Sequence, residues 1–559
     1  MPVKMVGSRA VATVAINGHP VPLTVDSGAF FSVLTEAAAT QLDLRTRSMS
    51  GLRVEGITGA MDARVTTVER LQLIKGDIPR VDFIVGGNEP GAGTMGLLGR
   101  NFLSFTDTEY DLANGVIRLS FPSDDCKKAN LAYWAGAAHV TELDLEPSYR
   151  SRSKAPPLRA RVKLNGTEAV ALLDTGARTI VTLRAARRAG ITDAQMTPSP
   201  AVSGIGRGTA RAWTAPFERV EIGDEAISNN RLHVGDFDLE DGEMLLGIDF
   251  FLSHRIYVSK TQDKVFITYN GGTVFALNRG SPTGPSPVPV EAAASGMPAP
   301  TADQLARRGA ASAARREFDR ALADLNQAIA LDATAPAHFV QRGLVLEALR
   351  RPDDAMADFE KAISLEPNHA EARFARAMLR LGMKDWEGAQ GDLDVLDKTL
   401  APQAQLRLAM STVYLRMDQP AQAVAQLNRW LPAHPNEVNR HSALNSRCWA
   451  RALLGVELHK ALDDCNDAIS AEPKNAAYLD SRGWVLLRLG RNREAIADFD
   501  GALALRPAIP VALYGRGLAM TRLGEAAKGS DDLAAARKAE PDIERRLARI
   551  GLTADLPKP

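Results

Sequence analysis

Several features that would assign a function directly are missing from this chain. The formal net charge is +0, from 67 basic and 67 acidic residues among 559, so the composition gives no support for a nucleic-acid partner or an acidic membrane surface. No apolar run approaches the ~18 residues that cross a bilayer. The first strand-like segment follows Met1 too closely to leave room for a signal peptide. We therefore expect no membrane span and a cytoplasmic protein, or a periplasmic one if a leader is missing.

Metal-ligand and nucleophile motifs are also missing. The nine histidines show no H-E-x-x-H or paired cysteine-histidine spacing, so we expect no metal and no cofactor, and no G-x-S-x-G motif supports a serine hydrolase. The three cysteines leave the compartment open. Cys126 stands alone, whereas Cys448 and Cys465 fall on the two helices of one predicted repeat. A disulfide between them is conceivable, but two small apolar core residues are the favoured interpretation.

The first half of the chain carries a duplicated motif. Residues 169–177 (AVALLDTGA) have a near-copy at 22–29 (PLTVDSGA), and an Asn-Gly turn between apolar runs precedes each copy. Downstream, each copy has a short helix, a glycine-rich hairpin and a Leu-Leu-Gly segment. The glycine of that segment follows its aspartate by the same 73 residues, from Asp26 to Gly99 and from Asp174 to Gly247. A duplicated β unit explains this pattern.

These motifs resemble the retropepsin-like aspartic proteases, in which D-[ST]-G-A, a flap hairpin and an apolar-apolar-Gly strand form one lobe. The resemblance covers about the first 270 residues and implies an all-β, bilobal N-terminal half. It further implies a catalytic pair that acts on a polypeptide substrate, loop residues that support the pair, and one flap residue from each lobe that covers the substrate. These residues are Asp26 and Asp174 for catalysis, Ser27, Gly28, Thr175 and Gly176 for support, and Ile57 and Ile205 on the flaps.

Two carboxyl groups explain why two copies are needed. Peptide hydrolysis by water needs a base for the water and an acid for the scissile carbonyl, and two adjacent carboxyls that share one proton supply both. By the resemblance, hydroxyl hydrogen bonds from Ser27 and Thr175 would join the two loops. Ala29 and Ala177 follow the glycines where pepsin-like enzymes tend to have a hydroxyl residue. We therefore expect a milder pH optimum than that of a gastric enzyme, and a sharp maximum near pH ~2 would contradict this.

The second half changes to a helical repeat with a period near 34. Small residues recur at one position of each unit, which is typical of tetratricopeptide repeats packed into an all-α solenoid. These residues are Gly309, Gly343, Ala377, Ser411, Cys448, Gly483 and Gly517. The predicted domains are lobe 1 at 1–121, a connector at 122–157, lobe 2 at 158–270, a Gly/Pro-rich linker at 271–300, and about seven repeats with a capping helix at 301–552.

In the repeat family, the position after the small residue faces a concave groove. Here it carries Trp449, Trp484 and Leu518, with Tyr514 nearby. An exposed aromatic ladder would suit a protein or peptide partner. Ordinary packing between repeats is an equally good interpretation.

The sequence thus favours an aspartic endopeptidase whose dyad forms between two tandem lobes, with repeats that recruit a substrate or a partner. Bacterial proteins of similar arrangement are often exported, which keeps the compartment open. Two alternatives remain at this point. The lobes could be a non-catalytic peptide-binding adaptor, or they could pair between chains.

Overall fold

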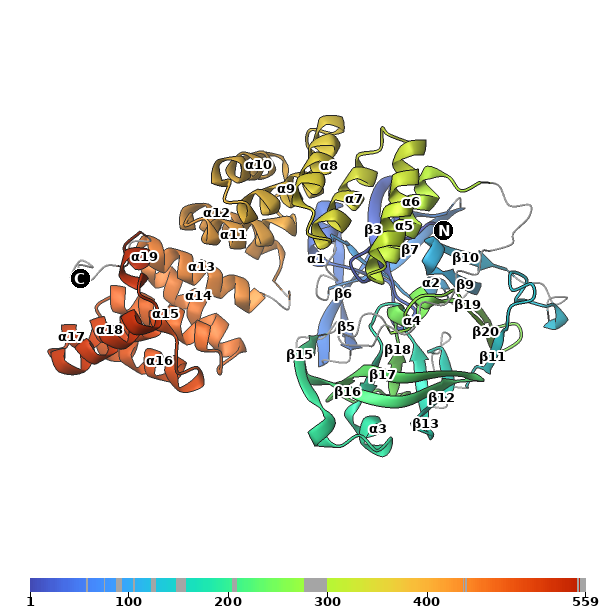
Figure 1. Cartoon of the computed structure of the whole chain (residues 1–559), viewed down its shortest axis with the longest axis horizontal. Helices are drawn as coiled ribbons and strands as arrows, with labels where there is room; N and C mark the ends of the chain where they lie inside the picture. Colours follow the sequence, from blue (N-terminus) through green and yellow to red (C-terminus); the bar gives the residue numbers. More distant parts are fainter. Residues whose placement is uncertain are drawn as a thin grey trace. The chain divides into compact units, whose positions relative to one another are not determined.

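The computed structural model describes residues 1–56, 59–74, 76–86, 93–103, 106–121, 127–146, 157–203, 209–275, 299–435, 437, 440–549 and 552. The chain divides into two compact units, Met1–Leu379 and Arg380–Pro559. The first unit holds strands and helices and the second holds helices (Figure 1). Among the described residues, no helix combines the length and the apolarity needed to cross a bilayer.

Lobe 1 is an eight-stranded sheet with the order β1-β2-β3-β8-β4-β7-β6-β5. A helix, α1 (Glu36–Gln41), follows β4, and its first turn is capped by the Thr35 hydroxyl. The buried side chains of β2 and β3 form the core of this lobe with Val68 and Phe83. The strands are β1 (Lys4–Val6), β2 (Arg9–Ile16), β3 (His19–Val25), β4 (Val33–Leu34), β5 (Thr46–Gly56), β6 (Gly59–Leu73), β7 (Gly76–Val85) and β8 (Gly96–Leu98).

Lobe 2 repeats the topology of lobe 1 without a counterpart of β1. Its seven-stranded sheet has the order β12-β13-β18-β14-β17-β16-β15. This order matches β2-β3-β8-β4-β7-β6-β5 of lobe 1 position by position. A short helix, α3 (Leu183–Arg188), takes the place of α1. The strands are β12 (Arg159–Leu164), β13 (Thr167–Leu173), β14 (Ile180–Thr182), β15 (Thr197–Ser203), β16 (Thr209–Ile222), β17 (Glu225–Gly235) and β18 (Met244–Leu246). The structure therefore has the duplicated β unit that the sequence pattern predicts.

A third sheet joins the two lobes. Its order is β10-β9-β19-β20-β11, and Tyr110 of β9 pairs with Ile256 of β19. Two strands come from the end of each lobe and one comes from the connector: β9 (Asp107–Asp111), β10 (Val116–Ser120), β11 (Thr141–Asp144), β19 (His254–Ser259) and β20 (Lys264–Tyr269). Short helices precede or follow these strands at α2 (Arg100–Leu103), η1 (Leu112–Asn114) and α4 (Ile248–Ser253). Strands of both lobes and of the connector thus belong to one sheet.

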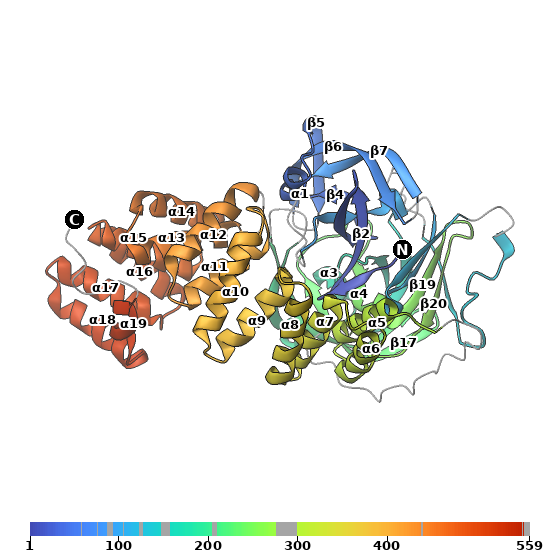
Figure 2. The ribbon, with the colours of Figure 1, turned by 90° about the horizontal axis from the view of Figure 1, so that it is seen from above.

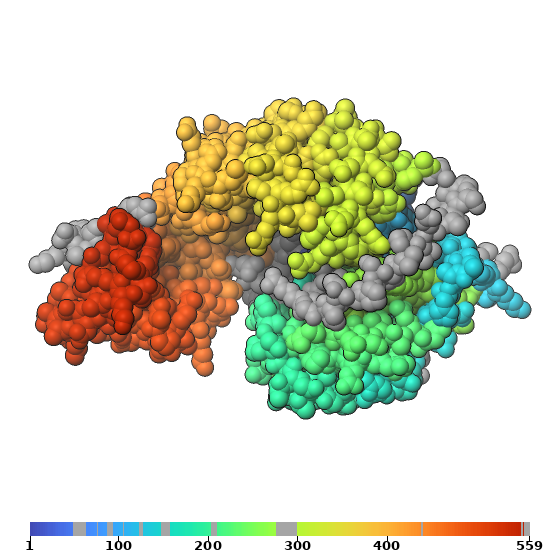
Figure 3. Space-filling view, in the orientation of Figure 1, coloured from blue at the N-terminus to red at the C-terminus, as the bar shows by residue number. Residues whose placement is uncertain are grey.

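The first helices after lobe 2 pack directly on the β part of the first unit. Helix α5 (Ala302–Ala314) contacts β1 and η1, and its Ala310 and Ala311 belong to the same buried cluster as Tyr110. Arg315 donates a hydrogen bond to the Leu252 carbonyl of α4 at 2.7 Å. Helices α6 (Phe318–Leu331), α7 (Pro336–Ala348) and α8 (Pro352–Leu365) follow (Figure 2). Figure 3 shows the surface of this stretch of the chain in yellow-green and yellow. The first helical repeats therefore belong to the same compact unit as the two lobes.

The second unit is a run of helical hairpins. Pairs of helices contact each other, and alternate helices α13, α15 and α17 also touch. Helix α9 (Ala370–Gly382) spans the boundary between the units, and the helices that follow are α10 (Trp386–Thr399), α11 (Leu406–Arg416), α12 (Pro420–Ala433), α13 (Arg440–Leu454), α14 (Leu458–Ala471), α15 (Ala476–Arg488), α16 (Asn492–Leu505), α17 (Pro510–Arg522), α18 (Ala526–Ala539) and α19 (Ile543–Arg549). This is the helical half that the sequence predicts.

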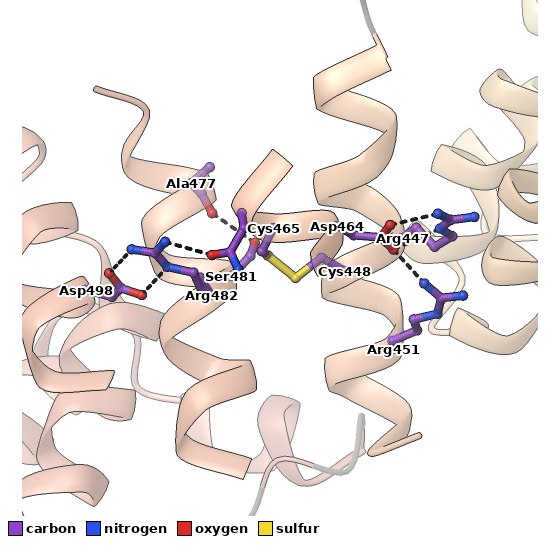
Figure 4. The surroundings of a disulfide bond; sticks show 10 residues. Arg447, Cys448, Arg451, Asp464, Cys465, Ala477, Ser481, Arg482 and Asp498 are labelled. Carbon is purple, nitrogen blue, oxygen red and sulfur yellow. Dashed lines mark hydrogen bonds and ion pairs between the residues drawn. A yellow bond between two sulfur atoms is a disulfide. The ribbon is translucent and has the colours of Figure 1, made fainter. Parts of the chain in front are cut away.

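Cys448 and Cys465 form a disulfide between α13 and α14 (Figure 4). The favoured interpretation of them as two free core residues is therefore wrong. Both are fully buried at the contact of the two helices. At the equivalent place in the next repeat, a side chain on Gly483 would meet Phe499, so the disulfide takes the place of a small residue packed on a large one.

The predicted aromatic ladder is not exposed. Trp484 is fully buried with its ring edge-on to Phe499, and Tyr514 and Leu518 are buried too. Trp449 is half-buried and packs against the same cluster. The prediction of an exposed ladder is wrong for the three buried residues, because their helices pack against the neighbouring hairpins. Packing between repeats, the alternative interpretation, describes them.

Candidate active site

The two D-[ST]-G-A loops occupy equivalent places in the two lobes. Asp26 directly follows β3, and Asp174 directly follows β13. Each loop starts beside a short parallel pairing, because β3 pairs with β8 and β13 pairs with β18. The Asp26 amide donates to the Leu98 carbonyl and the Asp174 amide donates to the Leu246 carbonyl, each at 3.0 Å. The Leu-Leu-Gly segments of the sequence therefore fix where the aspartates stand.

Reciprocal hydrogen bonds connect the two loops. The Ser27 hydroxyl donates to the Leu173 carbonyl at 2.9 Å and accepts from the Thr175 amide at 3.0 Å. The Thr175 hydroxyl donates to the Val25 carbonyl at 2.9 Å and accepts from the Ser27 amide at 3.0 Å. Both side chains are buried, so all four bonds lie away from water. The structure has the cross-lobe hydroxyl bonds that the resemblance implies.

Each aspartate lies over the glycine of the other lobe. A Cβ added to Gly28 would stand 2.3 Å from Cγ of Asp174, and one added to Gly176 would stand 2.3 Å from Cγ of Asp26. Only glycine allows such close approach at these two positions. The Asp26 Oδ1 accepts from the amides of Gly28 and Ala29 at 2.9 and 2.7 Å. The Asp174 Oδ1 accepts from the Gly176 amide at 2.8 Å. The fold thus brings the two carboxyl groups together.

Asp174 holds a proton more tightly than a free carboxyl does. Burial raises the pKa of Asp174 well above its ordinary value, and the charge of Asp26 and a hydrogen bond with Asp26 raise it further. The Gly176 amide and the more distant Arg100 act in the opposite direction. Two adjacent carboxyls cannot both ionise cheaply, which is the physical reason that the charge of Asp26 favours the protonated form of Asp174.

Two buried side chains that the sequence analysis missed lie beside the loops. Tyr110 of β9 is buried, burial raises the pKa of its hydroxyl, and hydrogen bonding to Ser27 opposes the rise. Arg100 directly follows the Leu-Leu-Gly segment and is also buried; burial lowers its pKa, whereas Asp26 and Asp174 raise it. Because Arg100 directly follows the Leu-Leu-Gly segment, the sequence could have indicated that it lies close to the aspartate loops. Nothing local marks Tyr110, whose place depends on the sheet between the lobes.

A second set of hydrogen bonds, made by one hydroxyl residue in each lobe, is also matched between the lobes. In lobe 1 the Ser32 hydroxyl donates to Asn101 Oδ1 at 2.7 Å and accepts from the Gly99 amide at 2.9 Å. In lobe 2 the Thr179 hydroxyl donates to Asp249 Oδ1 at 2.6 Å and accepts from the amide of Gly247 at 2.9 Å.

Asp249 thus takes the place of an asparagine. Burial raises its pKa, and hydrogen bonds from Thr179 oppose the rise. Its Oδ2 has no hydrogen-bond partner among the described residues. A protonated Asp249 has the shape of the Asn101 side chain and avoids a buried charge.

The flap residues Ile57 and Ile205 lie outside the described residues, and Cys126 does too. The structure therefore leaves their predicted place over a substrate untested.

Comparison with known proteins bears on both halves of the chain. Residues 12–105 and 160–253 each match the family model described as gag-polyprotein putative aspartyl protease. Residues 308–380 match a tetratricopeptide repeat model. No curated protein matches the chain.

Among the solved structures similar to the chain, two are described as tetratricopeptide repeat proteins. One is YrrB, described as having an unusual peptide-binding site, with 19% identity, coverage of 34% of this chain and 97% of that chain, and a TM-score of 0.31. Another, from Parabacteroides merdae, has 15% identity, coverage of 45% and 99%, and a TM-score of 0.33. A third, pilF of Pseudomonas aeruginosa, has 17% identity, coverage of 38% and 94%, and a TM-score of 0.31.

Proposed function

We infer that this chain, which carries two tandem retropepsin-like aspartic protease domains followed by tetratricopeptide repeats, is an aspartic endopeptidase with one active site. The observation that supports this most is the mutual approach of Asp26 and Asp174. Each carboxyl lies against the glycine of the other lobe, and the hydroxyls of Ser27 and Thr175 join the loops beneath them.

The proposed chemistry needs no group beyond the chain and a water molecule. The ionised carboxyl of the pair takes a proton from the water, which attacks the scissile carbonyl carbon. The protonated carboxyl gives its proton to the carbonyl oxygen. The Gly28, Ala29 and Gly176 amides hold one oxygen of each carboxyl in place. The pair acts as one titrating unit, so neither aspartate is assigned the base.

We further propose that both aspartates of a site come from the same chain. The sheet between the lobes supports this, since β9 of lobe 1 pairs with β19 of lobe 2 along Thr108 to Tyr110. Pairing between chains would require these strands to exchange partners. The helical repeats would then bind a protein or peptide, either the substrate or a docking partner.

The test is cleavage of a panel of unfolded proteins by the wild type, Asp26→Asn and Asp174→Asn. We expect each substitution to lower the rate at least about a hundredfold, because each removes the acid–base pair. Asp249→Asn is the matched control, since it makes the same chemical change at a buried aspartate and lobe 1 has Asn101 at that place. It should cleave as the wild type does.

Equal cleavage by all four proteins would exclude the dyad. If the wild type does not cleave but binds unfolded chains, the lobes are a peptide-binding adaptor. A mixture of the two inactive variants that regains activity would show that lobes pair between chains.

A further inference from the structure

The two halves of the proposed active site differ immediately beyond the matched loops. After Ala29, lobe 1 continues with Phe30 and Phe31, whose rings contact edge-to-face at 4.3 Å between centroids. After Ala177, lobe 2 continues with Arg178, which is exposed.

The main chain shows that these places are equivalent. The Ala29 carbonyl accepts from the Arg100 amide at 2.9 Å, and the Ala177 carbonyl accepts from the Ile248 amide at 2.8 Å. The same loop therefore presents aromatic rings on one side of the dyad and a guanidinium on the other.

A second arginine increases this difference. In lobe 1, Val11 pairs with Thr24, and the register continued by two residues places Arg9 level with Asp26. In lobe 2, Arg159 pairs with Leu172, and the same step places Pro157 level with Asp174. A cation therefore flanks the dyad from one of the two equivalent strands, and a proline stands at the other.

The charge of Arg178 in lobe 2 acts on Arg9 in lobe 1, and so do the charges of both aspartates. Burial lowers the pKa of Arg9; Asp26 and Asp174 raise it, and the charge of Arg178 lowers it. His233 is a third basic group beside them, because its strand pairs with β14 at Ile180. Burial and the charge of Arg178 lower the pKa of His233.

Within the described part of the chain, the acidic neighbours of Arg9 and Arg178 are restricted to the dyad. Among the residues that the structure describes, no carboxylate outside the dyad forms an ion pair with Arg9 or Arg178. Arginines elsewhere in this unit do pair, for example Arg255 with Glu109 and Arg211 with Asp236. Two like charges whose acidic neighbours are the dyad carboxyls alone favour a further anion brought by a ligand.

We propose that Arg9 and Arg178 form a cationic subsite that selects polypeptides with an acidic side chain on one side of the scissile bond, while Phe30 and Phe31 select an apolar side chain on the other. This rests on the proposed endopeptidase function and names its substrate class. The guanidinium of Arg178 would bind the aspartate or glutamate carboxylate, and Arg9 would add a second positive charge.

The test compares cleavage of three matched peptides that carry Glu, Gln or Lys at successive positions around one scissile bond. For the wild type we expect kcat/KM for the best Glu peptide to exceed that of its Gln partner roughly tenfold or more, as a charge-assisted hydrogen bond implies. In Arg178→Glu the preference for Glu over Gln should be lost, because the new carboxylate neutralises the charge of Arg9. Arg178→Lys should retain the acidic preference, because the charge is kept.

A peptide-binding measurement tests the subsite independently of catalysis. Fluorescence anisotropy of the same labelled peptides on Asp174→Asn should show the Glu preference, and adding Arg178→Glu should remove it. A wild type that cleaves, but prefers no charge or keeps its preference in Arg178→Glu, overturns the subsite and leaves the protease intact. A wild type that cleaves no peptide while the binding preference holds overturns the protease instead. Equal binding of all three peptides overturns the subsite in either case.

Discussion

Thr175→Val removes half of the hydrogen bonds that join the two loops. Valine keeps the branched shape of threonine but lacks the hydroxyl. The Val25 carbonyl loses its donor at 2.9 Å, and the Ser27 amide loses its acceptor at 3.0 Å. Both residues are fully buried. One buried polar group without a partner costs about 1–3 kcal/mol, so the two should lower the free energy of unfolding by roughly 2–6 kcal/mol.

Thr179→Val is the matched control. Thr179 is also fully buried and its hydroxyl also makes two bonds, but both partners, Asp249 and Gly247, belong to lobe 2. The two variants should therefore lose similar stability in chemical unfolding. Only Thr175→Val should loosen the contact between the lobes.

Hydrogen exchange of the lobe 1 peptide that contains Ser27 separates the two effects. A loss of about 2 kcal/mol in the free energy of opening accelerates exchange roughly 30-fold. We expect this acceleration in Thr175→Val, although the substitution is 148 residues away in lobe 2. The reasoning is refuted if exchange at Ser27 stays within about twofold of the wild type, or if Thr179→Val accelerates it equally.

Three further predictions concern a glycine, a buried acid and the disulfide. Gly28→Ala should abolish cleavage while the fold persists, because the new Cβ would stand 2.3 Å from Cγ of Asp174 and must push the carboxyls apart; retained activity would contradict this contact. The raised pKa of Asp249 means that the folded protein binds its proton more tightly than the unfolded chain. Its contribution to stability is therefore full below the ordinary aspartate pKa and falls as pH rises through the raised value, and Asp249→Asn should remove that fall in pH-dependent urea unfolding. Reduction of the bond between Cys448 and Cys465, which are 17 residues apart, should destabilise the helical unit by about 3 kcal/mol, whereas the double serine variant should not respond to the reductant.

The repeated motif made the active-site loops predictable from sequence. The matched 73-residue spacing assigned each Leu-Leu-Gly segment to the same duplicated unit as its aspartate, and the structure shows that the two are neighbours in the β3–β8 and β13–β18 pairings. The helical half was predictable for the same reason, since small residues recur where two helices touch. Local and repeating patterns carry this information because each unit must bury the same face.

What the sequence did not show depends on contacts between distant segments. The sequence analysis did not identify β9, whose residues are mostly polar, and it gave no sign that β9 and β19 pair across the lobe boundary and bring Tyr110 beside Ser27. The burial of Trp484 depends on neighbouring hairpins in the same way. We assigned Arg9 to the proposed cationic subsite only after the register of β2 and β3 was known. The disulfide required the distance between two helices, which the 17-residue spacing does not give.

The central claim is that Asp26 and Asp174 share one proton. Carbon-13 NMR of aspartate-labelled protein measures it directly, in an Asp249→Asn background that removes the other buried acid with a raised pKa in this unit. The account predicts a carboxyl pair that titrates in two steps, with the upper step well above the ordinary aspartate value. It also predicts that Asp26→Asn lowers the pKa of Asp174, because the neighbouring charge is gone. Two carboxyls that titrate independently near their ordinary value would contradict the account.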